Sequence, residues 1–329
     1  MAISEFVRRA GNEALEINPT TATIDITTAA SDFLWMVFSV MAATTIGVGI
    51  WAQFGVKHGQ RTFHHLSMMI TGTASVAYFC MASDLGSVAI PVEFIRGHYD
   101  ANPVTRSIWY ARYIDWTITT PLLLLELLLV TGLPLSDIII TIFADLVMII
   151  TGLIGSLVRS DYKWGLYSFG CAAMLYVFYM LYFPGRQASH SLGNELSKTY
   201  LIGASILSFI WFLYPIAWGL ADGGNVISPT GEMVFYGVLD LVAKPVFAIV
   251  HLYSMRKINY TQLQLTSGKY SEYSNDLKGD VPTTGGANGK TELTGNTTGA
   301  AHPVSVGKPT DAPHGATSPA GADSTVHGH

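Results

Sequence analysis

The chain has 329 residues, of which 50% are hydrophobic and 12% are charged, whereas soluble domains carry about 25% charged residues. The net charge is −5 and the basic residues are scattered, which excludes a typical nucleic-acid-binding protein; zinc-finger, helix-turn-helix and nucleotide-binding motifs are also absent from the sequence. Cys80 and Cys171 both fall in apolar segments and predict neither a disulfide nor a metal site.

Residues 1–30 precede the first apolar segment and contain charged residues from Glu5 to Asp25. They lack a continuous apolar core followed by a small-residue cleavage site, so we predict no removable signal peptide. We interpret them as an N-terminal segment outside the bilayer. The first apolar helix is then expected to direct membrane insertion itself.

Residues 31–260 contain seven apolar segments, joined by short connections except for Ser87–Thr105. A bilayer core of about 30 Å requires roughly 20 apolar residues in a helix, so these segments predict an all-α bundle of seven transmembrane helices. Pro184-Gly185 and Gly223-Gly224 are typical of breaks after the fifth and sixth helices. The segments are Phe33–Phe54, Leu66–Gly86, Ser107–Val130, Ile138–Val158, Trp164–Phe183, Tyr200–Leu220 and Met233–Tyr253.

The composition changes at about Thr261, where Gly, Thr, Ser, Asn, Pro and His become dominant. Residues 261–329 cannot bury a core, and we predict a disordered tail. The final His327-Gly328-His329 could bind a metal ion weakly, but we favour histidines without a metal site.

Seven spans place the two termini on opposite sides of the membrane. Basic residues should mark the cytoplasmic side, but six flank each side, so charge does not orient the chain. One side carries Lys57, Arg61, Arg186, Lys198, Arg256 and Lys257, and the other carries Arg8, Arg9, Arg96, Arg106, Arg159 and Lys163.

Ionisable residues inside a membrane are unfavourable by roughly 2.5–3.5 kcal/mol each and usually mark a pathway. In the last span, Asp240 and Lys244 are four residues apart and therefore share a helix face. One interpretation is a buried ion pair that holds helices together. We favour a lysine that forms a Schiff base, because desolvation beside a carboxylate makes its amine nucleophilic.

The third span carries Arg112, Asp115, Thr119 and Glu126 at helical spacing. Asp115 and Glu126 are separated by about 16 Å along a helix that rises 1.5 Å per residue, and they return to nearly the same face. Two carboxylates at two depths are typical of a proton relay, although Glu126 could instead be a protonated core residue. Asp145 in the fourth span lacks such a pattern, and we interpret it as a neutral, hydrogen-bonded acid.

Aromatic residues crowd the spans. Such residues are usually packing, but around a central lysine they could line a long conjugated ligand. They are Trp116, Tyr167, Trp211, Tyr214 and Trp218.

Together these residues resemble the microbial rhodopsins, and in particular the fungal members of that family. The resemblance covers about residues 30–257. Its motifs are Arg112-Tyr-Ile-Asp115-Trp-Thr-Ile-Thr119-Thr-Pro-Leu-Leu-Leu-Leu-Glu126 in the third span, Ala144-Asp145 with Met148 and Gly152 in the fourth, Met174-Leu-Tyr in the fifth, Trp211 and Tyr214-Pro215 in the sixth, and Leu239-Asp240-Leu-Val-Ala-Lys244-Pro in the seventh.

The resemblance implies a seven-helix bundle that encloses all-trans retinal, bound to Lys244 as a Schiff base. Asp115 and Asp240 would be the counterions of that Schiff base, and Asp115 would also be the proton acceptor. Glu126 would be the cytoplasmic proton donor. Arg112 would lie on the extracellular side of the Schiff base and tune the counterions.

The resemblance also implies supporting roles. Thr119 would hydrogen-bond Asp115, while Tyr78 and Tyr214 would hydrogen-bond Asp240. Residues that would line the retinal are Trp116, Thr120, Leu123, Met148, Gly152, Met174, Trp211, Tyr214 and Pro215.

Proton release to the outside would involve Glu232. Either Asp222 or Gly223 stands where bacteriorhodopsin has the second acid of its release pair, and the sequence leaves both alternatives open. Glu126 replaces the aspartate of bacteriorhodopsin at the donor position, and fungal relatives with glutamate there include slow-cycling ones.

Asp115, Thr119 and Glu126 form the set of residues found in the proton pumps of this family, whereas chloride and sodium pumps have other sets. We therefore expect a light-driven outward proton pump and not an enzyme. The alternative is a sensory photoreceptor with weak or no net transport, against which Glu126 argues. A light-gated channel or a retinal-free receptor is disfavoured by the presence of Lys244, Asp115 and Glu126.

By the same resemblance, the N-terminus lies outside and the C-terminus in the cytoplasm. We expect a multi-pass protein of the lipid bilayer, in the plasma membrane, with protons as the transported ion. A homo-oligomer and a partner that binds the tail are compatible with the sequence.

Overall fold

The computed structural model describes residues 12–256, 258, 260–263 and 265. Of the predicted N-terminal segment, residues 1–30, the structure therefore describes residues 12–30. Almost all of the predicted tail, residues 261–329, lies outside the described residues, so its predicted disorder stays a prediction.

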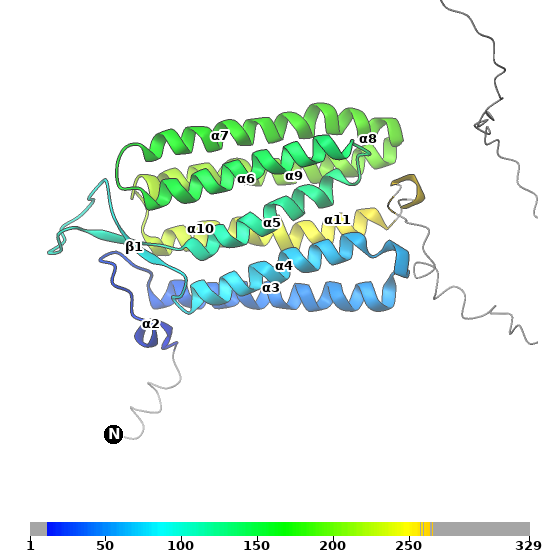
Figure 1. Ribbon diagram of the computed structural model, residues 1–329. Helices are drawn as coiled ribbons and strands as arrows, with labels where there is room; N and C mark the ends of the chain where they lie inside the picture. Colours follow the sequence, from blue (N-terminus) through cyan, green and yellow to red (C-terminus); the bar gives the residue numbers. More distant parts are fainter. Residues whose placement is uncertain (1–11, 257, 259, 264, 266–329) are drawn as a thin grey trace, which may run out of the picture. The chain divides into compact units, whose positions relative to one another are not determined.

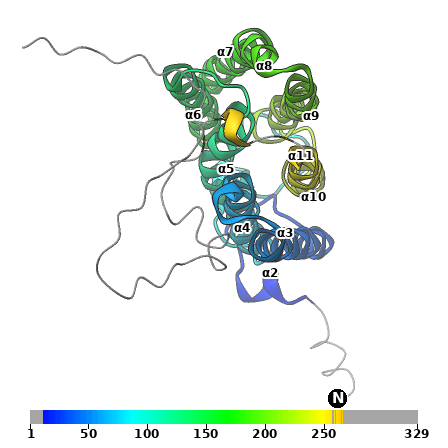
Figure 2. The same ribbon diagram turned by 90° about the vertical axis from the view of Figure 1, so that its right-hand side faces the viewer.

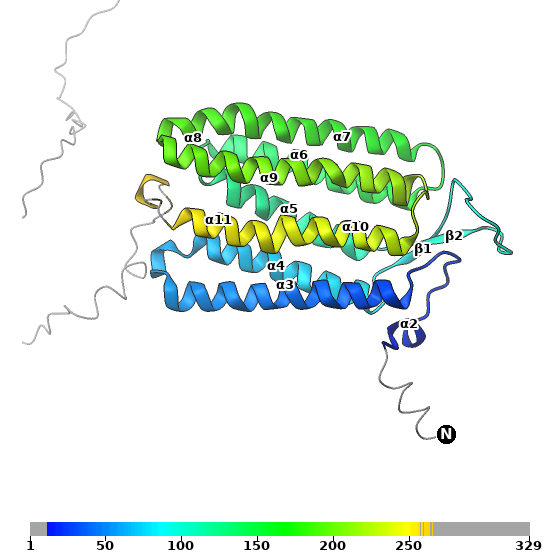
Figure 3. The same ribbon diagram turned by 180° about the vertical axis from the view of Figure 1, so that it is seen from behind.

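Seven long helical segments run side by side in the described chain (Figure 1 and Figure 3). Viewed along the bundle, they form a ring (Figure 2). The predicted seven-helix architecture is thus confirmed. The segments are α3 (Thr28–Gly55), α4 (Thr62–Ala82), α5 (Tyr110–Leu128), α6 (Leu135–Leu157), α7 (Lys163–Met180) with η2 (Leu181–Gly185) and α8 (Arg186–Leu192), α9 (Asn194–Trp218) with η3 (Gly219–Gly223), and α10 (Pro229–Leu241) with η4 (Val242–Val246) and α11 (Phe247–Met255).

Five of the described segments are long and apolar enough to cross a membrane, and only α4 and α5 fall short of that measure. In α5 the shortfall reflects its charged residues, Arg112, Asp115 and Glu126, all of which are buried. Large apolar side chains cover the outside of the bundle, as expected for a surface in contact with lipid. Examples are Ile46, Phe143, Phe169, Phe209 and Ile249.

The long connection between α4 and α5 forms an antiparallel hairpin that the sequence did not predict. Strand β1 (Val88–Pro91) pairs with β2 (Thr105–Ile108), and a further bridge joins Ile24 to Arg106. The short helix α2 (Ala14–Ile17) lies at the same end of the bundle (Figure 1). We call this the hairpin end.

The predicted break at Pro184-Gly185 is wrong, because the helix continues to Leu192 and ends at Gly193, whose φ is 131°. The helix widens by one residue per turn at η2, as is common where proline interrupts the hydrogen-bond ladder. The hydroxyl of Tyr200 donates to the carbonyl of Leu181 at 2.6 Å, which satisfies a polar group near the proline. The predicted break at Gly223-Gly224 is confirmed.

Helix starts follow ordinary capping chemistry. The Thr27 side chain accepts a hydrogen bond from the Ala30 amide at the start of α3. Ser228 does the same for the Gly231 amide ahead of α10, with Pro229 in the first turn. These caps define where the first and last long segments begin.

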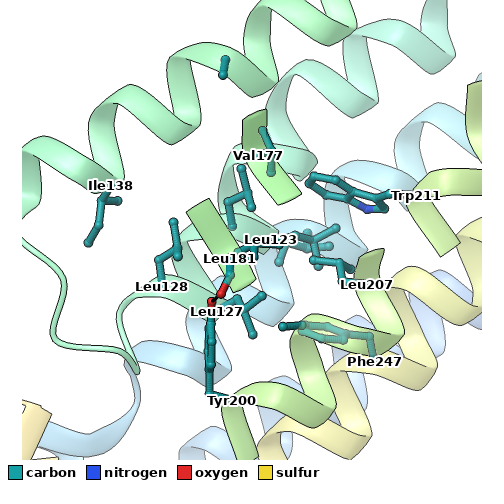
Figure 4. Packing of buried hydrophobic residues seen from close by; sticks show 14 residues of the cluster. Leu123, Leu127, Leu128, Ile138, Val177, Leu181, Tyr200, Leu207, Trp211 and Phe247 are labelled. Carbon is teal, nitrogen blue, oxygen red and sulfur yellow. Dashed lines mark hydrogen bonds between the residues drawn. The ribbon is translucent and has the colours of Figure 1, made fainter. Parts of the chain in front are cut away.

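The apolar core of one half of the bundle gathers around α5 and α9 (Figure 4). Leu207 lies there between Trp211 and Phe247, and Leu127 lies beside Tyr200 (Figure 4). Beyond it, at the end opposite the hairpin, the short helix η5 (Tyr260–Leu263) packs on the bundle. We call this the η5 end.

Candidate functional site

Lys244 lies in the middle of the last long segment, within the wide turn η4 and directly before Pro245. Such wide turns frequently mark functional sites. Its side chain is 2% exposed, and its Nζ is 2.5 Å from Oδ2 of Asp115 and 3.2 Å from Oδ1 of Asp240. One buried cation therefore lies between two buried carboxylates, one predicted from helical spacing and the other from the resemblance.

Asp240 is held by two tyrosine hydroxyls. Tyr78 on α4 donates to Oδ2 at 2.6 Å, and Tyr214 on α9 donates to Oδ1 at 2.5 Å. Each of these hydrogen bonds satisfies one oxygen of the buried carboxyl group. Asp240 thus has more stabilising donors than Asp115, and it lies with both tyrosines where the sequence predicted.

Asp115 is less fully bonded. Its Oδ2 accepts from Lys244, but its Oδ1 is buried and has no hydrogen-bond partner among the described residues. The hydroxyl of Thr119 donates to the main-chain carbonyl of Asp115 at 2.9 Å. Thr119 is therefore beside Asp115 as predicted, but this bond is to its backbone.

A cavity between the helices opens at Lys244, which is a common position for small-molecule sites in helical bundles. Seven aromatic side chains from several helices contribute to its wall, which also includes Lys244 and Asp240. Trp116 packs edge-on against Tyr113, Tyr214 and Tyr236. The largely apolar lining around one buried amine suits an apolar molecule attached at that amine.

Most residues predicted to line this cavity do so. Met174 and Tyr78 are buried but are not part of the wall; Tyr78 instead contacts Asp240. The predicted residues in the wall are Trp116, Thr120, Leu123, Met148, Gly152, Trp211, Tyr214 and Pro215, and the wall also includes Tyr113, Ile149, Tyr167, Gly170, Cys171, Trp218, Tyr236 and Ala243.

Glu126 lies on the η5 side of Asp115 along α5 and is fully buried. Ser67 on α4 donates to its Oε1 at 2.8 Å, while Oε2 has no hydrogen-bond partner within the described part of the chain. Sequence reasoning missed Ser67, since no local pattern in α4 reveals which residue of α5 it faces. Glu126 is thus a buried carboxyl group with one hydrogen bond among the described residues.

At the hairpin end, two arginines hold the carboxylate of Glu232. Arg112 donates to Oε1 at 2.5 Å and Arg106 donates to Oε2 at 2.7 Å. The guanidinium of Arg112 also lies 4.2 Å from the ring centre of Tyr236. Arg112 is therefore paired with Glu232. Arg106 is an additional candidate functional residue, which the sequence analysis included only among the basic residues that flank the spans.

Asp222, rather than Gly223, supplies a second acid near Glu232. Its side chain is buried and accepts a 2.5 Å hydrogen bond from the hydroxyl of Tyr113. Its other oxygen is buried without a hydrogen-bond partner among the described residues. Asp222 thus lies close enough to Glu232 for their charges to interact, and its correspondence to the second acid of the release pair stays a prediction.

Asp145 accepts a 2.7 Å hydrogen bond from Thr120 and is fully buried. Salt-bridge partners are absent for it among the described residues. This geometry fits the interpretation of a hydrogen-bonded acid beside the cavity.

The comparisons with known proteins agree with this arrangement. A family model described as "Bacteriorhodopsin-like protein" matches residues 28–258. Protein FDD123 of Trametes versicolor is 48% identical over 264 residues, which is 80% of this chain and 91% of that protein. The opsin-like protein carO of Fusarium fujikuroi is 44% identical over 262 residues, covering 77% of this chain and 84% of carO.

Among solved structures, a light-driven proton pump, LR (Mac), from Leptosphaeria maculans superimposes with a TM-score of 0.67. The two chains are 34% identical, and the match covers 71% of this chain and 100% of that one. Fold and sequence thus point to the same group of proteins.

Proposed function

The chain belongs to the bacteriorhodopsin-like family, the microbial rhodopsins, and on this premise we propose that it is a light-driven pump that moves protons outward. It is an integral membrane protein with fungal opsin-like relatives. The observation that carries the proposal is the position of Lys244 between Asp115 and Asp240, with Glu126 farther along α5.

We propose that the cavity holds all-trans retinal, attached to Lys244 as a Schiff base. The fit rests on a buried amine in the wall of a cavity to which seven aromatic side chains contribute. Retinal, when bound, supplies light absorption and a change of shape on isomerisation. Every other part of the mechanism depends on where the chain holds protons.

Asp115 is the proposed acceptor, because its Oδ2 already lies 2.5 Å from Lys244 Nζ and it has fewer donors than Asp240. A proton can pass directly from the Lys244 nitrogen to this oxygen. Asp240, with its two tyrosine donors, remains an anion beside Lys244 in this proposal. Thr119 fixes the turn of α5 that carries Asp115.

Glu126 is the proposed donor that returns a proton to Lys244. It lies about three helical turns from Asp115, on the opposite side of Lys244 from the hairpin end. Its burial and the apolar core residues of α5 between the two carboxyl groups, such as Leu123 and Leu124, separate the two proton sites, so that the returned proton comes from the other side of the membrane. This separation gives the transport its direction.

At the hairpin end, Glu232 and Asp222 are the proposed acids of proton release, with Arg112 between them and the counterions. This proposal places the N-terminus and hairpin outside and the C-terminus in the cytoplasm, in the plasma membrane. Self-association and a partner of the tail stay predictions.

The test is to illuminate cells that express the chain with added retinal and to record external pH. Acidification that a protonophore abolishes supports the pump. Lys244→Ala is expected to form no visible pigment and to produce no pH change, whereas Lys198→Ala, with a side chain 70% exposed, should retain both. A visible pigment in Lys244→Ala would contradict the attachment site, and a wild-type pigment that moves no protons would indicate a sensory photoreceptor.

A further inference from the structure

The helix η5 packs on the end of the bundle, although all its residues after Tyr260 fall in the segment with tail-like composition. Tyr260 and Leu263 are 8% and 7% exposed. Figure 2, which looks onto this end, shows η5, coloured gold, in front of the end of α5 and within the ring of helices. Both side chains join an apolar layer formed by Val48, Phe63, Leu66, Val130, Leu196, Leu252 and Met255.

This layer lies over Glu126. The ring of Tyr260 is 5.7 Å from the ring of Phe63, and Phe63 is one helical turn before Ser67 on α4. Ser67 in turn donates to Glu126. A row of side chains therefore extends from η5 to the interior, in the order Tyr260, Phe63, Ser67 and Glu126.

The phenol of Tyr260 is also within electrostatic reach of that carboxyl group. Burial, and then the charge of Glu126, raise the pKa of Tyr260 to about 12. Its hydroxyl thus remains protonated at physiological pH. The ring acts as a neutral, largely apolar body at the mouth of the bundle.

We propose that Tyr260, together with Leu263, is a positioning residue for proton uptake. The two side chains close the η5 end over Glu126, and they thereby limit the rate at which Glu126 regains a proton from the cytoplasm. This inference rests on the proposed role of Glu126 as donor. Since Glu126 is fully buried, a proton or water molecule from this side must pass the layer that Tyr260 completes. Apolar side chains of this kind exclude water, because hydrating apolar surface is unfavourable in free energy.

The experiment follows two separate steps in retinal-loaded protein. The first is the return of a proton to the Lys244 nitrogen, followed by visible absorption. The second is the recovery of the Glu126 proton from solvent, followed by the infrared carbonyl band of its protonated carboxyl group. Hydrogen–deuterium exchange of the same band in the dark gives a measure of water access that does not depend on light.

Tyr260→Ala is expected to accelerate recovery of the Glu126 proton about fivefold, as a barrier lowered by about 1 kcal/mol implies, and to accelerate dark exchange in the same direction. Tyr260→Phe, which keeps the ring and removes the hydroxyl, should match the wild type. Tyr253→Ala is the matched control, because Tyr253 is on α11 near the same end but is 64% exposed. Leu263→Ala removes the other η5 side chain of the apolar layer and should have the same effect as Tyr260→Ala. It serves as the second variant in case Tyr260→Ala folds poorly.

Unchanged recovery and exchange in both alanine variants would overturn the inference. Slower recovery in Tyr260→Phe would also overturn it, because the hydroxyl would then relay the proton rather than the ring exclude water. If Glu126→Gln leaves the return of a proton to Lys244 unaffected, the donor role itself fails. If Glu126→Gln slows that step and the alanine variants change nothing, the donor role stands and only the proposed closure by Tyr260 and Leu263 is wrong.

Discussion

The guanidinium of Arg106 lies 2.7 Å from Oε2 of Glu232, and both side chains are buried. Arg106 also donates to the side chain of Asn225 and to the carbonyl of Ile227. It therefore ties strand β2 to the loop before α10 while it shares Glu232 with Arg112. A buried carboxylate with two cationic donors is stabilised as an anion.

Arg106→Gln is expected to lower the free energy of unfolding by about 2 kcal/mol, since it removes charge-assisted hydrogen bonds but leaves Glu232 paired with Arg112. Thermal unfolding in detergent measures the loss. Arg96→Gln is the control, because exposed Arg96 lies on the same connection and donates only to the carbonyl of Gly224 among the described residues. Equal losses in the two variants would show that the hydrogen bond from Arg106 to Glu232 adds nothing to the free energy of unfolding beyond what an exposed arginine adds.

Asp115→Asn should leave a pigment with red-shifted absorption, because the cation on Lys244 loses its nearer counterion and retains Asp240 at 3.2 Å. Outward transport should fall by at least about 100-fold, since an amide cannot accept the proton. Light-induced pH changes in vesicles and the visible spectrum measure the two effects. Asp145→Asn is the matched control in a neighbouring helix, and it should retain transport; transport that survives in Asp115→Asn would refute the acceptor role.

Glu126→Gln should slow the return of a proton to the Lys244 nitrogen by about 100-fold, the scale expected when an acid catalyst is removed. Azide should restore the rate, because a small diffusible acid can replace the missing donor. Flash-induced absorption changes give the rate constant. Glu195→Gln, with a side chain 84% exposed, should behave as wild type, and an unaltered rate in Glu126→Gln would rule out its donor role.

The sequence predicted the features that depend on spacing within one helix. Hydropathy located seven spans, the four-residue interval placed Lys244 beside Asp240, and the third span placed Asp115 and Glu126 at two depths. These predictions succeeded because the period of a helix is fixed by its backbone geometry. The boundaries shifted by several residues where caps such as Thr27 extended a helix beyond its apolar part.

Contacts between helices could not be predicted in the same way. Ser67 faces Glu126, and Arg106 reaches Glu232, only because helices and a hairpin far apart in sequence pack in a particular register. The break expected at Pro184 failed for a related reason, since Tyr200 on the next helix supplies a hydrogen bond there. Leu263 likewise belongs to the packed bundle although it lies in residues 261–329, which have the composition of a tail.

Asp84 lies beyond the end of α4, outside the membrane-spanning helices, and it adopts a left-handed backbone conformation with φ of 56°. Burial, and then the nearby carboxylate of Asp25, raise the pKa of Asp84 from its ordinary value of 3.8 to about 7. A carboxyl group with a raised pKa in the folded state holds its proton more tightly there than in the unfolded chain. Its ionisation therefore destabilises the fold as pH rises from about 4 to about 7.

Asp84→Asn should remove this penalty, because asparagine is neutral and also tolerates the left-handed conformation. We expect the variant to unfold at a higher temperature than the wild type at pH 8, and to show little difference at pH 4, where Asp84 is protonated in the folded protein. Asp100→Asn, on the exposed connection between the two strands, is the control and should give no pH-dependent difference. A gain for Asp84→Asn that is the same at both pH values would mean that the effect comes from packing rather than from the charge that Asp84 acquires beside Asp25.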